Sequence, residues 1–171
     1  FAAIVPAAAA IEIIETAEAI RDETPVAAPV DDGIPVSVDT VLFEILQAEV
    51  GGHLVTIDQW LARARQTPSS ADEPLVRAIH TMNGAFAMTE VPAITDALTP
   101  AEGYVRRLLA SSNTASPEAV DAIGELASRV RATISALSQS GGRVPRCDAL
   151  AVRFIALRDS LPEFNPAAAV D

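Results

Sequence analysis

The chain has 171 residues, of which half are hydrophobic and only 4% are aromatic, and it carries a formal net charge of −11 at pH 7. This length suits one domain with a buried core. The acidic charge repels polyanions and no cluster of basic residues offsets it, so we expect no nucleic-acid partner.

The first 36 residues are rich in Ala, Pro and Val, and we expect an interdomain linker there. Within it, residues 11–23 (IEIIETAEAIRDE) could form a short helix. Because Phe1 is not an initiating residue, we expect a fragment of a longer protein. Residues 163–171 have the composition of a second linker. No uncharged apolar run reaches the roughly 18 residues of a spanning helix, so we expect no membrane partner.

The first long helix is predicted to begin after Asp39, a suitable N-cap. Gly51 and Gly52 fall inside it at a cost of about 1 kcal/mol each relative to Ala, but the apolar pattern keeps its phase through them. We therefore predict one continuous helix. Its apolar residues recur at spacings of three and four, which indicates one buried face: Phe43, Leu46, Val50, Leu54, Ile57 and Leu61.

The second helix follows the loop QTPSSADEP and runs to about Met88, with Asp72 or Ser70 as its cap and Pro74 in its first turn. A third helix is predicted next, and Pro100 within it should kink it or remove a hydrogen bond. Its apolar positions are Val91, Ile94, Leu98, Ala101, Val105 and Leu108.

Two further helices complete the pattern. The fourth ends at the sequence Ser140-Gly141-Gly142. Such amphipathic helices joined by short polar loops bury their apolar faces most simply as a bundle. We therefore predict an all-α fold over residues 37–162, an antiparallel up-and-down four-helix bundle with an additional packed helix. The apolar positions are Val120, Ile123, Leu126, Val130, Ile134 and Leu137 in the fourth helix, and Leu150, Phe154, Leu157 and Leu161 in the fifth.

His80 lies on the second helix but off its apolar face, which consists of Leu75, Ile79, Met82 and Phe86. By helical geometry it is displaced from that face by roughly 130°, so it should be accessible to solvent. A glycine one turn later, at position 84, is costly in mid-helix and suggests that another molecule approaches closely there.

The stretch LVRAIHTMNGAFAM resembles the histidine phosphotransfer (Hpt) domain, whose phosphorylated histidine usually stands in a motif of the form His-Thr-Leu-Lys-Gly-Ser/Gly-Ala. Here His80 is followed by Thr81, Met82, Asn83, Gly84 and Ala85. Chemotaxis kinases of this family carry a glutamate about 22 positions after the histidine, and Glu102 falls there. The surrounding ALTPAEGYV is similar to the segment found in CheA/ChpA-like hybrid kinases of type IV pilus systems.

The resemblance implies that His80 accepts a phosphoryl group and passes it to an aspartate of a receiver domain, while Glu102 orients the imidazole. The expected partners are a response-regulator receiver domain and a kinase catalytic domain, in a cytoplasmic signalling protein. They would supply Mg²⁺ and ATP, so the domain itself needs no cofactor and acts as a phosphocarrier rather than an enzyme. The residues expected near the phosphoryl group or the receiver are Arg77, Thr81, Asn83, Gly84 and Ala87.

Asn83 departs from the motif because the family carries a lysine at this position. An asparagine can donate a hydrogen bond but brings no charge, and Arg77 could partly substitute. The alternative function is therefore a degenerate Hpt bundle that acts as a docking or interaction module without carrying phosphate. The glycine and alanine face around Gly84 and Ala87 could also be a helix–helix contact.

The remaining candidate residues suggest structural roles. Cys147 is the only cysteine, so it forms no internal disulfide, and its spacing to Leu150 indicates a buried apolar residue. His53 matches no motif, and Trp60 is expected in the core. A metal-binding bundle would need Glu-x-x-His pairs, and the sequence has none, so we expect no metal.

Overall fold

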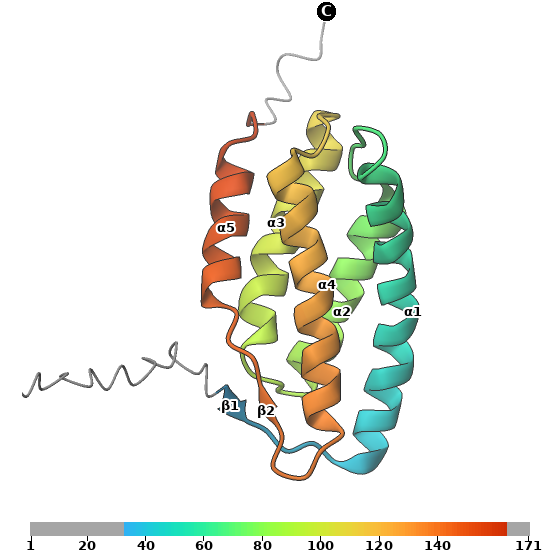
Figure 1. The fold of residues 1–171 in the computed structure, drawn as a ribbon, viewed down its shortest axis with the longest axis vertical. Coiled ribbons are helices and arrows are strands. Elements are labelled where there is room, and N and C mark those ends of the chain that lie inside the picture. Colours follow the sequence, from blue (N-terminus) through green and yellow to red (C-terminus); the bar gives the residue numbers. More distant parts are fainter. Residues whose placement is uncertain (1–32, 164–171) are drawn as a thin grey trace, which may run out of the picture. The chain divides into compact units, whose positions relative to one another are not determined.

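The structure, a computed structural model, describes residues 33–163, which form the predicted all-α antiparallel bundle (Figure 1). α1 packs against α2 and α4, α2 packs against α3, and α5 lies on α3 and α4. The predicted helix at residues 11–23 and nearly all of the predicted second linker lie outside the described residues. The helices are α1 (Thr40–Ala64), α2 (Glu73–Met88), α3 (Ile94–Ser111), α4 (Pro117–Leu137) and α5 (Asp148–Asp159).

Side-chain caps set where three of the helices begin. The Asp39 carboxylate accepts hydrogen bonds from the backbone N–H groups of Val41 and Leu42, at 3.0 and 3.3 Å. Asp72, rather than Ser70, caps α2 and accepts from the backbone N–H of Leu75 at 2.9 Å. Ser116 caps α4 in the same way. These oxygens satisfy N–H groups that have no partner within the helix, which is why these three helices start where they do.

The predicted apolar faces form one continuous core. Trp60 is 1% exposed and its indole N–H donates to the carbonyl of Ser70 at 2.9 Å, so it joins α1 to the following loop. Cys147 is buried, as predicted. Phe43, Ile134 and Leu161 are only partly buried and pack against this core. α1 continues through its two glycines and α3 continues through Pro100.

A short antiparallel pairing, which the sequence patterns did not indicate, closes one end of the bundle. β1 (Ile34–Pro35) pairs with β2 (Arg143–Val144), with Ile34 opposite Val144. The backbone N–H of Val36 also donates to the carbonyl of Gly142 at 3.1 Å. The last residues of the segment predicted as a linker are therefore hydrogen-bonded to the bundle.

α1 is also long and apolar enough to cross a bilayer, judged by its length and composition alone. No other helix within residues 33–163 meets that test. Helices from the cores of water-soluble domains often meet it too, and six residues of α1 are buried in this bundle.

Candidate functional site

The antiparallel pairing of α2 with α3 places His80 and Glu102 at the same level along the two helix axes. His80 stands eight residues before the end of α2 at Met88, and Glu102 stands eight residues after the start of α3 at Ile94. The rise per residue is the same in both helices, about 1.5 Å, so equal counts on either side of a tight connection bring the two residues level. Residues 89–93 make that connection.

The two side chains meet directly. Nδ1 of His80 lies 2.8 Å from Oε1 of Glu102. The histidine side chain is 61% exposed, whereas that of Glu102 is 17% exposed. An ionised carboxylate can only accept a hydrogen bond, so Nδ1 carries the proton of this pair. The second ring nitrogen, Nε2, makes no hydrogen bond with any residue in the described range, and its lone pair is available to a reaction partner.

Glu102 has three hydrogen-bond donors around its carboxylate. Arg106, one turn further along α3, donates from Nε to Oε1 at 2.9 Å, and its Nη2 forms an ion pair with the same oxygen at 2.8 Å. Asn83 donates from Nδ2 to Oε2 at 3.2 Å. Partial burial by itself raises the pKa of Glu102, but the hydrogen bonds from Arg106, Asn83 and His80 outweigh it and hold that pKa below its usual value. The carboxylate is therefore ionised at neutral pH.

Folding stability should depend on pH through this carboxylate. The pKa of Glu102 is lowered from 4.5 in the folded state, so its ionised carboxylate stabilises the fold above about pH 4.5. This stabilisation is lost as the pH falls through the lowered pKa of the folded state. We expect the wild type to exceed Glu102→Gln in free energy of unfolding at neutral pH. Urea denaturation between about pH 6 and pH 3 should show the difference shrinking. A difference that grew on acidification would contradict the lowered pKa.

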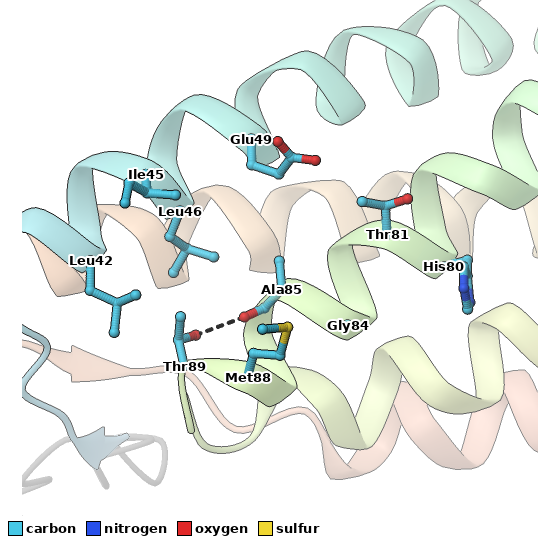
Figure 2. Close-up of a pocket in the computed structure, with 10 residues that line it drawn as sticks. All are labelled: Leu42, Ile45, Leu46, Glu49, His80, Thr81, Gly84, Ala85, Met88 and Thr89. Carbon is cyan, nitrogen blue, oxygen red and sulfur yellow. Dashed lines mark hydrogen bonds between the residues drawn. The ribbon is translucent and has the colours of Figure 1, made fainter.

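An apolar groove with a volume of about 490 Å³ runs between α1 and α2 beside His80. Figure 2 shows His80 at one end of it and Leu42, Met88 and Thr89 toward the other. Ile45 and Met88 are 63% and 87% exposed, a high exposure for such large apolar side chains. The other lining residues are Leu46, Glu49, Thr81, Gly84 and Ala85.

The remaining residues predicted near the phosphoryl group lie in different surroundings on α2. Thr81 and Gly84 line the groove, and Ala87 is exposed on α2. Asn83 faces Glu102 across the α2–α3 contact. Arg77 makes no ion pair or hydrogen bond with the pair, and lines a separate hollow beside His53. The structure therefore does not join Arg77 to His80 and Glu102.

Two residues that are hydrogen-bonded to Glu102 or Asn83 were not predicted from the sequence. Arg106 follows Glu102 by four positions, a spacing at which acidic and basic residues of a helix commonly pair, so a search for such pairs could have found it. Thr99 precedes Glu102 by three positions and donates from Oγ1 to Oδ1 of Asn83 at 3.3 Å. Its role depends on a residue of another helix, and no pattern within α3 indicates it.

Within residues 33–163, no group of three or more His, Cys, Asp or Glu side chains could hold a metal ion. The family model of the Hpt domain matches residues 41–140 of this chain. A search of curated proteins found no match, and neither did a search of solved structures.

Proposed function

Since this chain belongs to the Hpt domain family, whose members carry out histidine phosphotransfer in phosphorelays, we propose that His80 is its phosphoryl carrier. The single observation that carries the proposal is the exposed imidazole whose Nδ1 is held by an ionised carboxylate, while Nε2 has no hydrogen-bond partner among residues 33–163. A neutral imidazole nitrogen is a nucleophile near pH 7, and a carboxylate on the opposite nitrogen fixes the reactive tautomer.

In the proposed reaction, the Nε2 lone pair attacks the phosphorus of an aspartyl phosphate in a receiver domain. The N–P bond forms as the P–O bond to the aspartate breaks, and the aspartate leaves as a carboxylate. Because Nδ1 keeps its proton, the ring becomes positively charged, and Glu102 stabilises that charge at 2.8 Å. The reverse reaction returns the phosphoryl group to a receiver. The magnesium ion and the acidic pocket belong to the partner.

The groove between α1 and α2 supports a receiver as the docking partner. It is apolar and begins at His80, so a partner that packs into it also approaches the imidazole. Arg106, which is about half exposed beside Glu102, adds a positive charge on the α3 side of the histidine. A receiver presents an acidic phosphorylation pocket, which such a charge complements. We expect transient binding, since a carrier must release each partner.

Replacing Gly84 tests whether this surface is used. Gly84→Gln should leave the bundle as stable as the wild type, or more stable by up to about 1 kcal/mol, because a Cβ at this position meets no other heavy atom of the described residues within 4 Å. The same side chain would occupy space that a docked receiver needs, so transfer should slow at least about tenfold, as measured by rapid-quench labelling. Gly51→Gln is the matched control, because Gly51 is also an uncrowded helix residue, but it lines a different hollow, between α1 and α4. Equal transfer rates in both variants would exclude this docking surface.

The parent protein that we propose is a cytoplasmic CheA/ChpA-like hybrid kinase of a type IV pilus system, in which this module is one of several joined by linkers. The segment ALTPAEGYV around Glu102 and the flanks rich in Ala and Pro support this parent. A kinase catalytic domain and a receiver domain would then be partners in the same or a separate chain.

A second candidate function is a docking module that carries no phosphate, which the uncharged Asn83 favours. Incubation of this chain with a phosphorylated receiver, or an active kinase domain of the parent, separates the two functions. Incorporation of phosphate that is labile in acid and stable in base, as expected of phosphohistidine, supports the carrier. No incorporation from several competent donors, with circular dichroism showing a folded bundle, favours the docking module.

A further inference from the structure

Asn83 occupies the motif position where the family carries a lysine, yet its amide faces Glu102. Nδ2 donates to Oε2 of Glu102 and Oδ1 accepts from the hydroxyl of Thr99. Since an ionised carboxylate only accepts, the NH₂ end of the amide must face it, and the two contacts together fix the orientation of the group. Both ends of the side chain are therefore engaged within the bundle.

The three donors do not share the two carboxylate oxygens equally. His80 and Arg106 both bind Oε1, and only Asn83 binds Oε2. An arginine prefers to bind both oxygens of a carboxylate with two parallel hydrogen bonds. Without the amide on Oε2, the carboxylate of Glu102 would be free to rotate toward Arg106 and away from the imidazole.

We propose that Asn83 is a positioning residue, which holds the carboxylate of Glu102 so that Oε1 stays on Nδ1 of His80. The chain of hydrogen bonds runs from Thr99 through Asn83 to Glu102 and fixes which ring nitrogen is free to react. This inference rests on the proposed function for its effect on transfer, but its effect on the histidine tautomer is independent of phosphorylation.

The uncharged amide also has an electrostatic consequence. All 12 basic residues of the chain are arginines, and Arg106 is already paired with Glu102. A lysine at position 83 would place a second cation against the same carboxylate. It would compete with the imidazolium that forms during transfer, and so weaken the stabilisation that Glu102 gives it. Asparagine orients the carboxylate without that competition.

The test is nitrogen NMR of His80 in unphosphorylated protein, at a pH where the ring is neutral, combined with transfer rates. We expect the wild type to hold the proton on Nδ1, and Asn83→Ala and Asn83→Asp to show a mixture of the two tautomers. Aspartate keeps the shape of asparagine but repels Glu102, so it should have the larger effect. Both should slow transfer about tenfold or more, and Asn83→Lys should not exceed the wild type. Asn113→Ala, in the loop after α3, is the control and should match the wild type.

The outcomes separate this inference from the proposed function. If the wild type transfers phosphate but Asn83→Ala changes neither tautomer nor rate, Asn83 is no positioning residue. Faster transfer by Asn83→Lys with an unchanged tautomer would likewise overturn the inference. It would show that the side chain at position 83 interacts with the phosphoryl group. If the wild type takes no phosphate while Asn83→Ala still shifts the tautomer, the positioning role stands and the proposed function fails.

Discussion

Replacement of His80 by glutamine is expected to abolish phosphate incorporation while the bundle stays folded. Glutamine has no nucleophilic nitrogen, because its amide lone pair is delocalised, so no N–P bond can form. The His80 side chain is largely exposed and makes one hydrogen bond within the described part of the chain, so the free energy of unfolding should change by no more than about 0.5 kcal/mol. The measurement is incorporation of labelled phosphate from a phosphorylated receiver, with unfolding followed by circular dichroism.

His53→Gln is the matched control for this experiment. The chain has two histidines, and each binds a glutamate through one ring nitrogen. His53, however, pairs with Glu49 of its own helix, at 3.3 Å. The His53→Gln variant should therefore incorporate as much phosphate as the wild type. Full labelling of His80→Gln, or loss of labelling in His53→Gln alone, would move the phosphorylation site away from His80.

Replacement of Glu102 by alanine is expected to slow transfer by about tenfold to a hundredfold, or roughly 1.4–2.7 kcal/mol in activation free energy. The carboxylate performs two tasks in the proposed reaction: it keeps the proton on Nδ1, and it stabilises the positive charge that develops on the ring. Glu102→Gln removes the charge but keeps an oxygen that can accept a hydrogen bond, so its rate should lie between alanine and wild type. Single-turnover labelling with excess phosphorylated receiver measures the chemical step.

Glu125→Ala provides the control for the loss of a paired carboxylate. Glu125 lies on α4 and binds two arginines, Arg129 and Arg153, but no histidine. Its replacement removes an equivalent ionic cluster and should leave the transfer rate unchanged. A rate for Glu102→Ala equal to that of wild type would remove Glu102 from the mechanism, whatever its contact with His80.

Much of the fold could be predicted because it depends on patterns within single segments. The apolar residues of α1 repeat in phase from Leu46 to Leu61, and Asp39 stands where the first N–H groups need an acceptor. Each of these signals acts within a few positions along the chain. The β1–β2 pairing joins residues more than 100 positions apart, and two-residue strands leave no periodic pattern, so sequence reasoning missed it.

The same distinction, between signals within one segment and contacts between segments, applies to the candidate site. The sequence determined that His80 is exposed, because a helical count over Leu75–Phe86 is enough to place it off the core face. The family motif pointed to Glu102. The tertiary structure alone decided that Asn83 binds the carboxylate, that Arg106 shares its Oε1 with the imidazole, and that Arg77 lies apart. Those contacts depend on how α2 and α3 are rotated and aligned against each other, which the packing of the whole core sets and no single segment encodes.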